Sequence, residues 1–196
     1  MKDLVKDIDF INELENMKKT LRKTKVVGTD RFENDAEHSW HVTMMALILN
    51  KYKEIDADLN RTLEMLLVHD IVELYAGDTY AYDSNGYKDK LDREKKAMEK
   101  IKEQLSQENA KKIEELWLEF EEVESEEAKF ANSMDRLQPV FLNASREDGG
   151  TWKEHGIKKS QVVARLEAVK DFNVDLYSYS MGLLDESVDK GYLING

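Results

Sequence analysis

The chain contains four histidines and no cysteine, so any metal site must be built from His, Asp and Glu side chains. His69 is followed directly by Asp70 inside an apolar run that extends from Leu66 to Ile71. Burying an unpaired charge there would cost several kcal/mol or force the group to become neutral, so the pair needs a partner. A divalent metal ion is one such partner, because imidazole nitrogen and carboxylate oxygen together suit Mn, Fe, Co, Zn or Mg.

Two further residues have the types and the positions of metal ligands. His38 lies on the apolar face of a helix that should begin at Asn34 or Asp35, and Asp135 lies beside the apolar stripe of a later helix. Separate helices can direct such side chains into one core. A lone histidine on an apolar face is more often a hydrogen-bonded core residue, so the hypothesis depends on the combination.

The elements that must position these residues are helices, because apolar residues recur with helical period along nearly the whole chain. The sequence predicts no strand, an irregular polar stretch over about 22–34, and an ordered loop near the site over 78–89. We expect an all-α, single-domain helical bundle that covers residues 1–196. The expected helices cover about 4–21, 34–49, 60–75, 91–105, 113–120 and 125–141, with two more through 163–169 and 177–188.

Composition narrows the class of partner. The formal charge of −12, without a dense basic patch, disfavours a nucleic acid polymer, which would be repelled. No run of about 18 apolar residues is present, so no membrane span is expected. The start at Met1 is amphipathic and unlike a signal peptide, so we expect a cytoplasmic protein. A small anionic substrate remains compatible with this charge, because it needs only a local cation.

Three stretches of the chain together resemble the HD-domain metal-dependent phosphohydrolases, and within them the bacterial 5′-deoxynucleotidase branch. They are RFENDAEHS at 31–39, HDIVELYAGD at 69–78 and DRLQP at 135–139. The order and spacing of all three are much more specific than a His-Asp dipeptide. The resemblance implies an HD-type helical bundle, one divalent metal ion of open identity, and a homodimer. It also implies the metal ligands, which are His38, His69, Asp70 and Asp135.

The resemblance further implies proton-transfer roles for Glu73 and Asp78, next to the His-Asp pair. Glu73 would orient or deprotonate a water, and Asp78 would protonate the leaving oxygen. Without the motif, the favoured interpretation of Glu73 is a solvated helix residue, and that of Asp78 is a turn residue.

Arg31 is the counterpart of a phosphate-binding residue in the family pattern, although a surface arginine that bonds a helix cap is the competing interpretation. The family also places an Arg-Trp pair earlier in the chain. This sequence has Arg22 and Lys23 there and no tryptophan, which leaves the base and sugar preference open.

The expected reaction is hydrolysis of (deoxy)nucleoside 5′-monophosphates to nucleoside and phosphate by a metal-activated water. One alternative is a hydrolase of another nucleotide, such as guanosine tetraphosphate or a nucleoside triphosphate. Leu74 after Glu73 speaks against the stringent-response type, which has Glu-Asp. A second alternative is a non-catalytic protein that only binds a nucleotide, and the presence of all the expected ligands and of both Glu73 and Asp78 argues against it.

Overall fold

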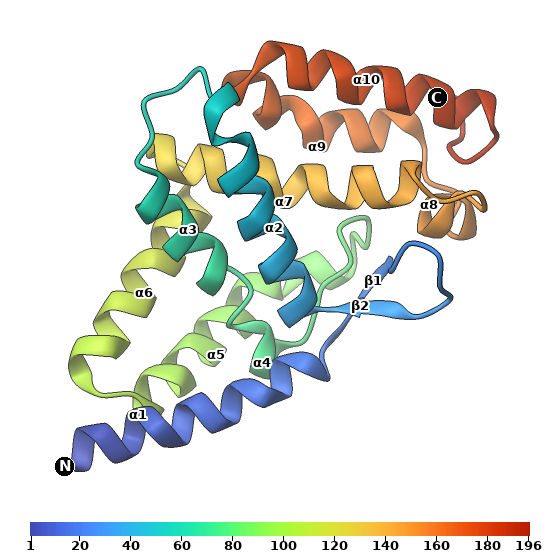
Figure 1. Ribbon diagram of the computed structural model, residues 1–196. Helices are drawn as coiled ribbons and strands as arrows, with labels where there is room; N and C mark the ends of the chain where they lie inside the picture. Colours follow the sequence, from blue (N-terminus) through green and yellow to red (C-terminus); the bar gives the residue numbers. More distant parts are fainter.

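A computed structural model describes residues 1–196, and most of the chain is helical (Figure 1). The all-α prediction is therefore confirmed. None of the helices combines the length and the apolar character that crossing a membrane requires. The α-helices are α1 Lys2–Glu13, α2 Asp35–Leu49, α3 Leu59–Val68, α4 Glu73–Ala76, α5 Lys90–Gln104, α6 Gln107–Glu122, α7 Glu126–Ala144, α8 Gly150–Glu154, α9 Lys159–Phe172 and α10 Val174–Asp189; the 3₁₀ turns are η1 Leu14–Lys18, η2 Asn50–Tyr52 and η3 Gly86–Lys88; the strands are β1 Leu21–Lys25 and β2 Phe32–Asn34.

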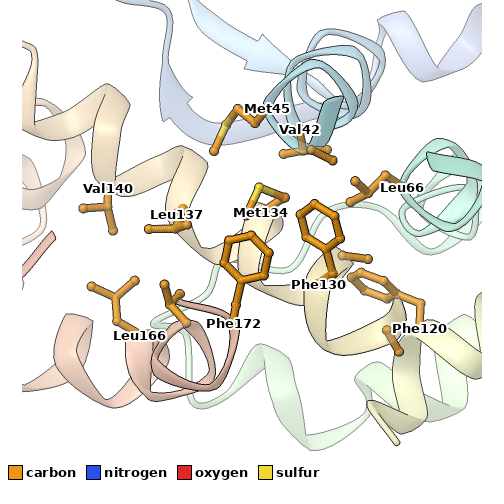
Figure 2. Packing of buried hydrophobic residues seen from close by; sticks show 14 of the residues in the cluster. Val42, Met45, Leu66, Phe120, Phe130, Met134, Leu137, Val140, Leu166 and Phe172 are labelled. Atoms are coloured by element: carbon orange, nitrogen blue, oxygen red, sulfur yellow. The ribbon is translucent and has the colours of Figure 1, made fainter. Parts of the chain in front are cut away.

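Helix α7 is the central element of the fold, because α2, α3, α6 and α9 all pack against it (Figure 1). Ser125 begins it, since the Ser125 hydroxyl accepts a hydrogen bond from the Ala128 amide at 3.1 Å. Met134 of α7 has no exposed surface and lies among apolar side chains from the neighbouring helices (Figure 2). The candidate ligand Asp135 follows it directly, so the core holds that residue on a rigid element.

Phe130 is one of the aromatic rings in this core, and its removal is expected to destabilise the fold. Its ring stacks on Phe172 with centroids 4.6 Å apart, and both side chains are fully buried (Figure 2). Phe130→Ala should therefore lower the free energy of unfolding by about 3–5 kcal/mol, measured by urea denaturation. Val5→Ala, at an exposed position of α1, is the control and should change it by about 0.5 kcal/mol or less. A loss below about 1 kcal/mol for Phe130→Ala would contradict this account of the core.

The first helix differs from the prediction in length and in its buried face. It ends at Glu13 and continues only as the 3₁₀ turn η1 to Lys18. Leu4, Ile8 and Ile11 recur with helical period and would be expected to form the buried face of this helix. They point outward instead, and are exposed by 60%, 48% and 63%. A helix buries one face, and here the large ring of Phe10 takes the buried position, in an apolar cluster with side chains of α5 and α6.

The stretch predicted to be irregular contains a β-hairpin, so the prediction of no strand was wrong. Strands β1 and β2 pair antiparallel, with Leu21 opposite Asn34, and Gly28 has a φ of 77° in the connecting turn. The β1 sequence LRKTK has no regular alternation of apolar and polar residues, so periodicity could not reveal it. The hairpin leads into α2 (Figure 1). Arg22 of β1 thereby lies near the start of that helix, with its Nη1 atom 3.9 Å from Asp35 Oδ1.

The helix predicted over 60–75 is interrupted at the His-Asp pair, which corrects its expected mid-helix position. Helix α3 ends at Val68, and α4 begins at Glu73. Between them the backbone hydrogen bonds span three residues, as in the 2.9 Å bond from the Glu73 amide to the Asp70 carbonyl. A 3₁₀ turn brings side chains three residues apart onto the same side. Glu73 therefore shares a face with Asp70, and one oxygen atom of each lies within 4.8 Å of the other.

Candidate active site

The four predicted metal ligands converge in the structure, although they come from three separate segments. His38 lies on α2, His69 and Asp70 follow α3, and Asp135 lies on α7. The Nε2 atom of His38 is 3.1 Å from Asp135 Oδ1 and 3.7 Å from Asp70 Oδ2. The Nε2 atom of His69 is 3.1 Å from Asp70 Oδ2 and 3.9 Å from Asp135 Oδ1. Two imidazole nitrogens and two carboxylate oxygens thus face one point.

Local hydrogen bonds orient the two imidazole rings. The Nδ1–H of His69 donates to the Leu66 carbonyl at 2.8 Å, which leaves the Nε2 lone pair directed into the site. His38 lies in α2, which begins with a capping box in which the Asn34 side chain accepts from the Glu37 amide at 3.0 Å. The amide of Asn34 in turn donates to the Glu37 carboxylate at 3.1 Å. The helix start is therefore well defined, and so is the position of His38 one turn later.

The residues present fit a divalent metal ion. The Nε2 atom of His69 is buried and has no hydrogen-bond partner, which is costly for a polar atom unless a ligand occupies the space in front of it. Burial and Arg22 oppose protonation of His38, yet the carboxylates around its ring raise its pKa to about 9. The site therefore attracts positive charge. A set of two imidazoles and two carboxylates is typical of sites for Mn, Fe, Co or Zn.

Arg22 points from β1 into the same cluster. Its Nη1 atom is 2.5 Å from Asp70 Oδ2, and its side chain is only 13% exposed. Burial alone would lower the pKa of Arg22, but the charges of Asp70, Glu73 and other carboxylates outweigh it and raise the pKa. Arg22 is therefore a permanent cation at the candidate metal site, suitably placed to contact an anion there.

Glu73 and Asp78 lie on the wall of a cavity of about 320 Å³ that also reaches Asp70 and Asp135. Burial raises the pKa of both Glu73 and Asp78, and the negative charge of Asp70 raises it further. The 78–89 segment is an ordered loop beside this cavity, as predicted, and it contributes aromatic lining. The lining residues from that loop are Asp78, Thr79, Tyr80, Ala81, Tyr82 and Tyr87.

The structure separates the three cationic residues that the resemblance had grouped. Lys23 is exposed and lies on the lining of the cavity beside Arg22. Arg31, in contrast, does not line the cavity, and its contacts match the competing interpretation of an arginine that bonds a helix cap. Both of its terminal guanidinium nitrogens pair with the carboxylate of Glu37, at 2.7 and 3.0 Å. Arg31 thus stabilises the capping box of α2 through its surface ion pair with Glu37.

Two buried acidic residues of the site, Glu33 and Asp35, were not among the site residues predicted from the sequence. Glu33 accepts a hydrogen bond from the Gln138 amide at 2.6 Å, and its other oxygen lies 3.6 Å from His38 Nδ1. Asp35 was considered only as a possible helix cap. Because Asn34 takes the cap position, Asp35 enters the first turn, where it is completely buried. Its separation of three residues from His38, on one helix face, was the signal that could have identified it.

The chain is similar to known proteins in sequence and in fold. A family model described as HD domain matches residues 14–174. The crystal structure of a predicted metal-dependent phosphohydrolase from Magnetospirillum magnetotacticum MS-1 is 39% identical, covers 97% of this chain and 95% of that one, and has a TM-score of 0.91. The protein PH0347 of Pyrococcus horikoshii OT3, at 22% identity and a TM-score of 0.66, covers 90% of this chain and 99% of its own, and shares the fold.

Two curated relatives carry the name 5′-deoxynucleotidase HDDC2. The mouse protein is 30% identical over 121 residues, which are 62% of this chain and 59% of that protein. The Dictyostelium discoideum protein is 31% identical over 130 residues, which are 63% of this chain and 68% of that protein. The chain therefore matches about three fifths of the length of the mouse relative.

Proposed function

The chain belongs to the HD domain family, and from this membership we propose that it is a metal-dependent phosphohydrolase of (deoxy)nucleoside 5′-monophosphates. The observation that carries the proposal is the convergence of two imidazole Nε2 atoms and two carboxylate oxygens beside a cavity that contains a buried arginine. The names of the curated relatives support the substrate class.

The proposed metal ligands are His38, His69, Asp70 and Asp135. A divalent ion bound there supplies positive charge to a phosphate oxygen and lowers the pKa of a water from about 15.7 toward 7. The identity of the ion among Mn, Co, Fe, Zn and Mg is left to the experiment, because this mixed nitrogen and oxygen set accepts several of them.

Glu73 and Asp78 are the proposed proton-transfer residues. Glu73 lies three residues from Asp70 on the same side of a 3₁₀ turn, so it can accept a proton from the attacking water. Burial and the charge of Asp70 raise the pKa of Asp78, which is the direction required of a residue that donates a proton to the leaving 5′-oxygen. Glu73 takes one proton of the water, and the other stays on the oxygen that becomes part of the inorganic phosphate. The proton from Asp78 completes the 5′-hydroxyl of the nucleoside.

Arg22 and Lys23 are the proposed phosphate-binding residues, because both line the cavity and both carry positive charge. Arg22 presents a planar guanidinium that can hold two phosphate oxygens at once. The aromatic side chain of Tyr82 lines the same cavity and offers a flat apolar surface to a base or sugar.

The test is a screen for phosphate release by the full chain, first freed of metal and then loaded with Mn²⁺, Co²⁺ or Mg²⁺. Deoxynucleoside monophosphates should release phosphate faster than ribonucleoside monophosphates, nucleoside triphosphates or guanosine tetraphosphate. Release from the triphosphates or the tetraphosphate alone would replace the proposed substrate class. Binding of a monophosphate with no release under any metal would support a non-catalytic protein.

We further propose that the chain forms a homodimer through one apolar face. Ile11 of α1, Trp40 of α2 and Leu67 of α3 line a shared groove and are 63%, 66% and 60% exposed. The outward stripe of α1, with Leu4 and Ile8, continues the apolar surface along that helix. A twofold interface uses the same patch on both subunits, so a groove and a ridge on one face can complement a second copy.

Trp40→Glu is expected to weaken this dimer, because it places a charge at the centre of the apolar groove. The expected loss is at least about 2 kcal/mol, or roughly thirtyfold in the dissociation constant. Sedimentation equilibrium should show wild type at twice 22.8 kDa and the variant nearer 22.8 kDa. Tyr179→Glu, at an exposed position of α10, is the matched control and should remain dimeric. A monomer produced by Tyr179→Glu alone would place the interface on another face.

A further inference from the structure

A second group of carboxylates lies beside the histidine site. Asp35, Asp70 and Glu73 each offer one oxygen atom, and these three atoms lie within 4.8 Å of one another. Asp70 also faces the histidines, since its Oδ2 atom is 3.1 Å from His69 Nε2. Asp70 therefore belongs to both groups, and the two groups are directly adjacent.

The buried oxygens of this second group have no donor. Asp35 is 0% exposed, and neither of its carboxylate oxygens has a hydrogen-bond partner. Glu73 is 6% exposed, and its Oε2 atom is likewise buried and unpartnered. Buried carboxylates are normally paired or bound to a metal, because their desolvation is otherwise uncompensated. Three unsatisfied oxygens in one place indicate an absent cationic ligand.

Arg22 does not satisfy this requirement. Its Nη1 atom is 3.9 Å from Asp35 Oδ1, which is beyond hydrogen-bond distance, while its short contact of 2.5 Å is with Asp70. The amides at the start of α2 do not satisfy Asp35 either, because the side chain of Asn34 is the acceptor at that helix terminus. The Asp35 carboxylate is thus left to a ligand in the space it shares with Glu73.

The carboxylates around Arg22 outnumber its single guanidinium. Asp70 Oδ2 lies 2.5 Å from Arg22, Glu33 Oε2 and Asp35 Oδ1 each lie 3.9 Å from it, and Asp135 Oδ1 lies 4.0 Å from it. This excess of acidic groups favours the binding of a cation beside them.

We propose that Asp35, Asp70 and Glu73 bind a second divalent cation next to the one assigned to the histidines. A set made only of carboxylate oxygens favours a hard ion, Mg²⁺ or Mn²⁺. Paired metal sites in phosphate-processing enzymes lie about 3.5–4 Å apart, and a carboxylate shared like Asp70 allows that spacing. Glu73 keeps its proposed part in proton transfer, since only its Oε2 atom is assigned to the cation.

This inference rests on the proposed metal centre, so its test must separate the two. The full chain, freed of metal, is dialysed to equilibrium against Mn²⁺, and bound manganese is counted by elemental analysis. Wild type is expected to bind two Mn²⁺ per chain, and Asp35→Asn only one, because the histidine site remains. Asp30→Asn, at an exposed position of the hairpin turn, is the matched control and should bind two.

Electron paramagnetic resonance of the wild type provides a readout that needs no variant. Two neighbouring Mn²⁺ ions should give an exchange-coupled signal, which Asp35→Asn should replace with that of an isolated ion. One Mn²⁺ at saturation, two uncoupled ions, or two ions retained by Asp35→Asn would each overturn the second site. The first of these outcomes would mean that a proton occupies the space between Asp35 and Glu73. Binding of no manganese would overturn the histidine site as well.

Discussion

Asp70→Ala is expected to abolish both metal binding and phosphate release. Asp70 contributes the carboxylate that lies 3.1 Å from His69 Nε2 and 3.7 Å from His38 Nε2. Its removal leaves the proposed metal ion with three of its four protein ligands. It also removes the 2.5 Å partner of Arg22. We expect a fall in kcat/KM on the order of a thousandfold or more, equivalent to about 4 kcal/mol of transition-state stabilisation.

Two measurements check this prediction together. Elemental analysis of the purified variant should show metal well below one equivalent, and phosphate release should be at background. Asp56→Ala, which removes an exposed aspartate from a loop, should match wild type in both and is the control. Full metal occupancy in Asp70→Ala would show that the ligand assignment is wrong, whatever the activity.

Glu73→Gln is expected to separate catalysis from binding at the histidine site. Glutamine has nearly the shape of glutamate but cannot accept the proton of a water, so kcat should fall by about 10²–10⁴-fold with a much smaller change in KM. The ligands His38, His69 and Asp135 are untouched, so at least one equivalent of metal should remain.

Metal content and kcat are measured in the same preparation of Glu73→Gln, because only the two together distinguish a proton-transfer residue from a metal ligand. Retained metal with lost turnover is the result expected of a proton-transfer residue. If manganese falls from two equivalents to one, the same variant also supports the second cation site, since Glu73 Oε2 is one of its three oxygens. Unchanged kcat in Glu73→Gln would remove Glu73 from the proposed mechanism and favour a purely structural role.

The sequence alone was enough for the main helices and for the positions that could ligate a metal. Apolar periodicity identified most of the helices, because each helix must bury one face whatever its neighbours are. The absence of cysteine limited the ligands to His, Asp and Glu. The resemblance of three stretches to the HD-domain phosphohydrolases then implied four ligands, His38, His69, Asp70 and Asp135, and the structure brings these four together.

Only the tertiary structure determined which side chains face the site and which face solvent. Arg31 and Arg22 are both arginines of one hairpin, yet Arg31 pairs with Glu37 at the surface while Arg22 reaches Asp70. Asn34 and Asp35 are equally suitable helix caps in sequence, but the choice of Asn34 sends Asp35 into the interior. The tight turn after α3, together with the packing of α2, places Asp70 and Glu73 beside Asp35.

These outcomes share a physical reason. Residue type and helical period are local properties, so they can be read from the chain itself. The buried face of α1 and the hairpin depend on contacts between segments that are distant in sequence, such as α1 with α5 and β1 with α7. Residue type, helical period and the resemblance were therefore enough to predict the four ligand positions, whereas the inward position of Asp35 was decided by the packing of the whole chain.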